Sequence, residues 1–210
     1  MSSLKVTPTN HQKAAYGGEN WSPRTMTHRD EIGTLWASCG LNSEWAPLKQ
    51  VLLHPPGPEL GQVSNPESAQ LLKTLDWESA NDQHRAIVEA YRNAGTTVHL
   101  VEPQETPPPN LIFCADLFFM TPEGAILARP ASTVRAGEER LVSQRLADLG
   151  IPILRTLTGQ ATFEGADALW LDPHTVLIGR GLRTNREGAR QVTTTLNEIG
   201  VDPIVIDLPI

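Results

Sequence analysis

The chain has 210 residues, of which 40% are hydrophobic and 20% charged, as is usual for a globular protein with a buried core. A net charge of −7 disfavours a phosphate backbone as partner, so no nucleic-acid function is expected. No run approaches the ~20 apolar residues of a membrane helix, and the N-terminus lacks the apolar core of a signal peptide. We therefore expect a cytoplasmic protein without a membrane partner, whose two cysteines, Cys39 and Cys114, are reduced.

The first part of the chain differs in composition from the rest. Residues 1–43 are polar, mix Pro, Gly, Asn and Thr, and show no sustained periodicity. They predict an irregular or flexible N-terminal arm, with a short ordered piece near 32–37. Strand-like and helix-like patterns begin after this arm, so residues 44–210 are expected to form one α/β domain.

Within that domain one order of elements recurs. Helices are expected over 80–93, 138–149 and 185–199. Each is followed by a helix-ending glycine and then a strand, the glycines being Gly95, Gly150 and Gly200. Pairs of short strands are expected before the second and third helices, over 110–120 with 124–130 and over 161–171 with 175–181.

Each unit is thus strand, strand, helix, strand, and one helix covers only one face of its small sheet. Several units must then pack around a common axis to bury the other faces. The rival architecture is an open doubly wound sheet, which also alternates strands and helices. The paired short strands disfavour it, and no Gly-x-Gly-x-x-Gly phosphate loop follows a strand.

The segment 110–120 carries an acid in an apolar setting. Asp116 lies between Phe113 and Phe118, where burial is costly unless a cation or hydrogen-bond donors pair with the carboxylate. Strand alternation would place Cys114, Asp116 and Phe118 on one face. The alternative is an aspartate at a strand end that caps a turn.

A second acidic motif lies in the segment 161–171. Glu164 and Asp167 stand on either side of Gly165 and Ala166, within an otherwise apolar run. Small residues allow a ligand or a second backbone to approach closely. The alternative is a tight turn with exposed acids.

Two arginines occupy matching places in the second and third units. Arg135 and Arg183 each precede the expected helix, beside a Ser-Thr or Thr-Asn pair that could cap it. Such arginines could fork onto a carboxylate while the three acids pair with a cation, which would suit a zwitterionic ligand. The alternative is a pair of unpartnered surface arginines. The histidines share no spacing with cysteine or with each other, so no metal site is expected.

Four segments occur in order between residues 43 and 210: SEWAPLKQVLLHPPGPE, NLIFCADLFFMTPEGAILARPASTVRAGEE, FEGADALWLD and TVLIGRGLRTNREG. Together they resemble the amidinotransferase, arginine deiminase and dimethylargininase superfamily. The resemblance implies an α/β-propeller of strand-strand-helix-strand blades, about three of five being present, and no cofactor. It implies that the catalytic acids Asp116 and Glu164 grip the substrate guanidinium and that Asp167 belongs to the same motif. It assigns the substrate's α-carboxylate to Arg135 and Arg183.

In the superfamily a cysteine thiolate attacks the guanidinium carbon and a histidine serves as general acid and base. This sequence departs from the pattern: Ala115 stands where an arginine often precedes the aspartate, and the acidic motif reads Glu-Gly-Ala-Asp. No residue aligns with the superfamily's histidine or cysteine, so we expect a chain that stops before its nucleophile. Cys114 is a poor substitute, because two neighbouring acids would raise its pKa.

These observations predict a guanidino-group modifying enzyme, here a fragment, that acts on arginine or a related compound by hydrolysis or amidino transfer. The alternatives are a non-catalytic protein that binds a guanidino ligand, or a small protein completed by a partner. Because an incomplete propeller exposes strand edges and apolar faces, self-association through open blade edges is expected.

Overall fold

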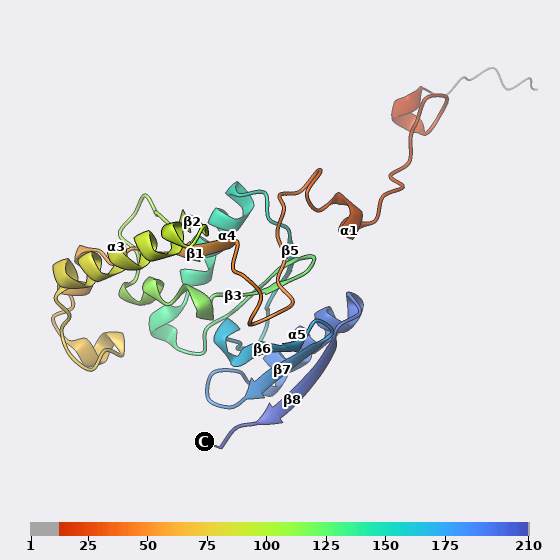
Figure 1. Ribbon diagram of the computed structural model, residues 1–210. Helices are drawn as coiled ribbons and strands as arrows, with labels where there is room; N and C mark the ends of the chain where they lie inside the picture. Colours follow the sequence, from red (N-terminus) through yellow and green to blue (C-terminus); the bar gives the residue numbers. More distant parts are fainter. Residues whose placement is uncertain (1–12, 210) are drawn as a thin grey trace, which may run out of the picture.

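The computed structural model describes residues 13–209 and builds them into three small sheets, each with a helix (Figure 1). Residues 1–12 of the expected arm and residue 210 lie outside the described residues. The first sheet pairs β1 (Gln50–Leu53) in parallel with β2 (Thr97–Leu100). The long helix α3 (Trp77–Asn93) connects these two strands.

The second and third sheets share one topology. In the second, β4 (Gly124–Leu127) lies between antiparallel β3 (Phe118–Thr121) and parallel β5 (Ile153–Thr156). In the third, β7 (Thr175–Arg180) lies between antiparallel β6 (Ala168–Asp172) and parallel β8 (Asp202–Asp207). Helix α4 (Glu138–Asp148) and helix α5 (Arg186–Glu198) provide the crossovers. The order strand, strand, helix, strand is the one that the sequence predicts for a unit.

The glycines that were expected to end the helices do so. Gly95, Gly150 and Gly200 have φ of 81°, 72° and 74°, the left-handed conformation in which a helix commonly terminates. Side-chain capping is less regular. Asn185 caps α5 by accepting from the Gly188 N–H at 2.8 Å, whereas Gly137 precedes α4 and provides no side-chain cap.

Two of the expected strands were assigned too long. The segment 110–120 forms two short 3₁₀ helices, η3 (Pro109–Ile112) and η4 (Cys114–Asp116), before β3 begins. Likewise η6 (Gly165–Asp167) occupies the middle of 161–171, and β6 follows it. The prediction that strand alternation puts Cys114 and Asp116 on one face is therefore wrong. The polar groups of these turns are held by tertiary contacts, which override the apolar strand-like pattern.

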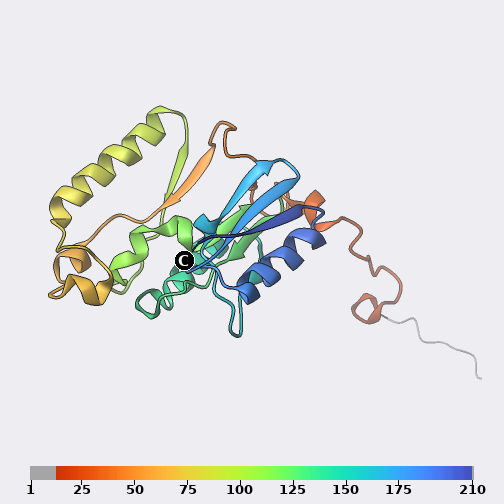
Figure 2. The same ribbon diagram turned by 90° about the horizontal axis from the view of Figure 1, so that it is seen from below.

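The expected N-terminal arm contains two short helices among irregular segments, η1 (Ala14–Tyr16) and α1 (His28–Glu31). Residues after α1 contact the second unit: the Ala37 N–H donates to the Gly150 carbonyl at 3.0 Å. The part before α1 leads away from the three sheets in both views (Figures 1 and 2). Further short helices follow β1, α2 (Pro58–Gly61) and η2 (Pro66–Ala69), and η5 (Thr133–Arg135) precedes α4. No helix within residues 13–209 has the length and apolarity that a bilayer crossing requires.

The core consists of two apolar clusters, one centred on the second unit and one that extends from the third unit into the second. In the second unit Val142 and Leu146 of α4 pack with Leu117 and Leu127. In the third, α5 covers one face of the sheet and buries Trp170 and Ile178 with residues that include Val192 and Leu196. The rings of Phe119 and Trp170 stack with centroids 5.8 Å apart, which joins the two units directly.

The two units also meet at Gly165, where backbone packs on backbone. A Cβ at this position would lie 2.2 Å from the Phe118 carbonyl oxygen and 2.5 Å from that of Ala115. Only glycine allows this approach, so η6 is held against η4. Gly165, one of the small residues of the acidic motif, thus allows a second backbone segment to approach closely.

We predict that Gly165→Ala destabilises the protein by about 2–3 kcal/mol, because the added methyl group must push two backbone segments apart. Thermal melts followed by circular dichroism would measure this. The control is Ala166→Ser, since Ala166 is the exposed neighbour in the same turn and should change the melting temperature little. Equal melting temperatures for the two variants would contradict the close approach.

Candidate guanidinium-binding site

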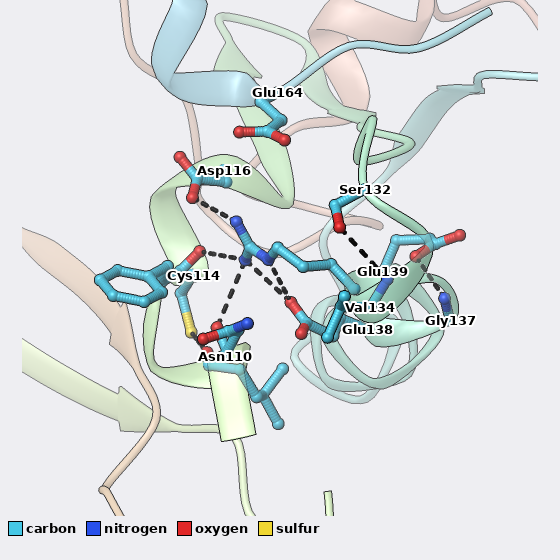
Figure 3. Close-up of polar contacts among 12 residues, drawn as sticks. Asn110, Cys114, Asp116, Ser132, Val134, Gly137, Glu138, Glu139 and Glu164 are labelled. Carbon is cyan, nitrogen blue, oxygen red and sulfur yellow. Dashed lines mark hydrogen bonds and ion pairs between the residues drawn. The ribbon is translucent and has the colours of Figure 1, made fainter. Parts of the chain in front are cut away.

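The site lies where η4 of the second unit meets η6 of the third. Asp116 ends η4, and Glu164 directly precedes η6, which ends at Asp167. Figure 3 shows the Glu164 carboxylate beside that of Asp116. The three acids that the sequence singled out therefore come from two adjacent turns, brought together by the close packing at Gly165.

Asp116 is paired with a buried arginine. Arg135 Nη1 donates to Asp116 Oδ2 at 2.5 Å, and the Arg135 side chain is only 4% exposed. The same guanidinium donates from Nε to Glu138 Oε2 at 2.9 Å, and its Nη2 forms an ion pair with that oxygen at 2.8 Å. Nη2 also reaches the carbonyl oxygens of Asn110 at 3.3 Å and Phe113 at 3.2 Å. All three nitrogens of Arg135 thus donate to acceptors of the protein.

Burial sets the electrostatics of this cluster. Burial alone would lower the pKa of Arg135, but its hydrogen bonds to Glu138 and Asp116 outweigh burial and raise the pKa above its ordinary value. Burial also raises the pKa of Glu138 to about 7, although the bond to Arg135 acts in the opposite direction. Glu138 therefore changes its charge near neutral pH, while Arg135 stays charged.

Glu164 holds the second arginine more loosely. Arg183 Nη1 lies 3.3 Å from Glu164 Oε1 and 3.4 Å from Oε2, and the Arg183 side chain is 46% exposed. Glu164 Oε1 also accepts from the Ala131 N–H at 3.4 Å. Asp167 is fixed from the other side, because its Oδ2 accepts from the Thr184 hydroxyl at 2.6 Å.

Cys114 lies close to this cluster but is unsuited to nucleophilic attack. Its side chain is buried, and Sγ donates to the Leu111 carbonyl at 3.3 Å. Burial, reinforced by Glu138 and Asp116, raises the pKa of the thiol to about 12. A thiolate is therefore scarce at neutral pH. The direction agrees with the prediction, while the main cause is burial rather than the neighbouring acids.

Four of the five predicted site residues form two ion pairs with each other, while Asp167 accepts a hydrogen bond from Thr184. The pairing itself was not predicted: Arg135 holds Asp116, and Arg183 holds Glu164, so neither arginine stands free for a substrate carboxylate. Arg135, fully enclosed by protein acceptors, departs most from the carboxylate-binding role that the resemblance implies for it.

Two contributors were missed by the sequence reasoning, Glu138 and Thr184. The signal for Glu138 was its place three residues after Arg135 at the start of a helix, where (i, i+3) side chains meet. In the sequence Thr184 belongs to the Thr-Asn pair that could cap the third helix, which gives no sign of its bond to Asp167. Among the described residues no group of three or more His, Cys, Asp and Glu side chains is arranged to hold a metal ion.

Solved structures define the class of protein. A structure of the Pseudomonas aeruginosa dimethylarginine dimethylaminohydrolase, a cysteine-to-serine mutant complexed with citrulline, superposes with a TM-score of 0.66 at 26% identity. The match covers 77% of this chain and 62% of that one. The N-terminal domain of ArgZ, a cyanobacterial arginine dihydrolase, matches with a TM-score of 0.64 at 22% identity. At this identity the match establishes a shared fold but not a shared activity. The chain thus has the mixed α/β fold of the guanidino-modifying superfamily that its sequence resembles.

The sequence matches specify the family. The family model for N,N dimethylarginine dimethylhydrolase, eukaryotic, matches residues 67–207. The N(G),N(G)-dimethylarginine dimethylaminohydrolase of Pseudomonas aeruginosa is 29% identical over 133 residues, which make up 63% of this chain. That of Streptomyces coelicolor is 28% identical over 162 residues, covering 76% of this chain and 60% of its own length. The chain belongs to the dimethylarginine dimethylhydrolase family. It spans about half the length, 52%, of the Pseudomonas relative.

We predict that the two arginines contribute very differently to stability. Arg135→Gln should cost about 3–5 kcal/mol, because it leaves two carboxylates without their buried counter-charge. Arg183→Gln removes a half-exposed pair and should cost less than about 1 kcal/mol. Urea unfolding of the two variants and the wild type would measure both values. Similar losses of unfolding free energy for the two variants would contradict the conclusion that buried Arg135 holds the site together.

Proposed function

We propose that this chain is the guanidinium-binding part of a hydrolase that acts on arginine or a methylated arginine. The observation that carries the proposal is the Asp116–Glu164 pair, two carboxylates from adjacent units that each already hold a guanidinium. The family relationship supports the same class, since relatives carry the name of dimethylarginine dimethylaminohydrolases. Hydrolysis is favoured over amidino transfer for this reason.

The acids orient a poor electrophile. A guanidinium is planar and resonance-stabilised, and carboxylates that bind its N–H groups fix its plane and direct attack at its carbon. Glu164 is the acid from which an incoming guanidinium displaces the internal partner. Its contact with Arg183 is long and partly solvated, whereas the contact of Asp116 with Arg135 is short and buried.

Arg183 then has a second task. Once the substrate guanidinium takes its place on Glu164, the released and half-exposed Arg183 is free to bind the substrate's α-carboxylate. Asp167 contributes by anchoring the turn through Thr184. Arg135 keeps Asp116 in place rather than meeting the substrate carboxylate.

The covalent chemistry implied by the resemblance is not assigned to any described residue. Cys114 has a thiol pKa of about 12, and burial also raises the pKa of Cys39. The proposal for residues 13–209 is therefore restricted to binding and orienting the guanidino compound. A non-catalytic guanidino-binding role is the second candidate, favoured by this lack of a reactive thiol among the described cysteines.

The wider architecture is also part of the proposal. We propose that the three units are blades of an α/β-propeller and that residues 44–210 form one domain. The shared topology of the second and third sheets supports this arrangement. We place the protein in the cytoplasm, with a small guanidino compound as its ligand.

Binding of L-arginine tests the proposed function directly. We predict weak binding by isothermal titration calorimetry, reduced by about 10–100-fold in Asp116→Asn, because the variant loses a charge-assisted hydrogen bond. Asp202→Asn is the matched control, because Asp202 is an exposed aspartate of β8 away from the described site. Equal affinities for the wild type and Asp116→Asn would contradict the proposal.

A pair of ligands isolates the role of Arg183. Agmatine is arginine without its carboxylate, so Arg183→Ala should weaken arginine binding by about tenfold and leave agmatine binding unchanged or stronger. The gain for agmatine would come from freeing Glu164 of its internal partner. A parallel loss for both ligands would show that Arg183 does not bind a carboxylate.

We also propose that the chain self-associates through β8. Within the described residues β8 is one of the two edge strands of its sheet, and Ile204 and Ile206 are 45% and 46% exposed. An edge strand with apolar side chains is a template for pairing with another copy. Light scattering after size exclusion should show mass rising with concentration, and Ile204→Lys with Ile206→Lys should abolish the rise. Leu72→Lys is the control, because Leu72 is a fully exposed apolar residue outside β8. A monomer at every concentration would refute self-association.

A further inference from the structure

Glu138 is a completely buried acid that the proposed function does not use. It lies in the first turn of α4 with 0% of its surface exposed. Its Oε2 accepts a hydrogen bond from Arg135 Nε and forms an ion pair with Nη2, whereas Oε1 is buried without a hydrogen-bond partner among the described residues. A carboxylate buried with one oxygen unsatisfied is costly, and such a group calls for an explanation.

The explanation lies in what Glu138 does to the guanidinium of Arg135. A guanidinium is planar and rigid, so fixing one edge of it fixes the direction of every N–H group. Glu138 takes the edge formed by Nε and Nη2, and the Phe113 carbonyl binds Nη2 as well. Nη1 is then directed at Asp116 Oδ2, 2.5 Å away. Figure 3 shows this chain of contacts from Glu138 to Asp116, with Glu164 next to it.

We infer that Glu138 is a positioning residue: it fixes Arg135, and Arg135 in turn holds the Asp116 carboxylate beside Glu164 in the arrangement that binds a guanidinium. The inference rests on the proposed function, in that Asp116 is taken to bind the ligand. Among the described residues no hydrogen bond or ion pair joins Glu138 to Glu164, and the Glu138 carboxylate is paired with Arg135.

Charge gives Glu138 a second effect. When Glu138 is ionised it balances Arg135, and Asp116 keeps its negative charge for the ligand. When Glu138 is protonated, Arg135 is left to neutralise Asp116 alone, and attraction for an incoming guanidinium weakens. The other charged or titratable groups that act on Glu138 or feel its charge are Glu139 and Cys114.

The sign of the pH dependence follows. Glu138 has a pKa of about 7, so it is ionised above this pH and neutral below it. Guanidinium affinity is therefore highest above about pH 7 and falls as the pH decreases through that value. The ligand guanidinium keeps its charge throughout this range.

The first experiment measures L-arginine affinity between about pH 6 and pH 8 for the wild type, Glu138→Gln and Glu139→Gln. We expect wild-type affinity to fall by about tenfold at the lower pH, and Glu138→Gln to bind weakly at every pH without this dependence. Glu139→Gln is the matched control, because it lies next to Glu138 on the same helix but bonds to the Gly137 N–H instead of Arg135. A folded Glu138→Gln protein with wild-type affinity and pH profile would overturn the inference.

The second experiment needs neither ligand nor variant. In wild-type protein labelled with ¹⁵N, the Arg135 side-chain N–H resonances should shift with a midpoint near pH 7, while those of exposed Arg183 should not. Arg135 resonances that stay constant between about pH 6 and pH 8 would overturn the inference, whether or not Glu138→Gln folds. If Arg135 titrates but no guanidino compound binds at any pH, the proposed function has failed and the coupling of Glu138 to Arg135 stands.

Discussion

The buried guanidinium of Arg135 determines how the site is arranged. It contacts two carboxylates and two backbone carbonyl oxygens. Arg135 binds Asp116 of η4 and Glu138 of α4 together, and it also donates to two carbonyl oxygens of the segment before η4. Each of these groups would be costly to bury alone. The segment leading to β3 therefore takes the shape that serves Arg135, two 3₁₀ turns instead of a strand.

The second constraint is the backbone contact at Gly165. It places the acidic turn of the third unit against the turn that ends in Asp116, so that Glu164 and Asp116 become neighbours. Neither unit has a complete set of acids by itself. A site built at a contact between repeats uses the rigidity of two cores, and the stacked rings of Phe119 and Trp170 reinforce the same contact.

The two internal ion pairs differ in a way that matters for function. The Arg135 pair is buried and short, and it serves as part of the framework. The Arg183 pair is long and half exposed, so breaking it would cost little. Burial raises the pKa of Glu138 to about 7, so the charge of this residue beside Arg135 changes near neutral pH. The two arginines occupy matching places in the sequence but differ in the structure. Arg135 is fixed inside the protein, whereas the pair of Arg183 is more easily broken.

The sequence by itself determined the repeat, the helices with their terminal glycines, the family and the list of acids and arginines. These features depend on local patterns of apolar residues, turns and motifs, which a chain carries wherever it folds. Tertiary structure decided the 3₁₀ turns around Asp116 and Asp167, the partners of each arginine, and the part played by Glu138. The physical reason is that a buried charge selects its neighbours from elements far apart in the chain. Arg135 meets Asp116 across 19 positions, and no local pattern encodes that the carboxylate expected to meet a ligand is held by the protein's own guanidinium.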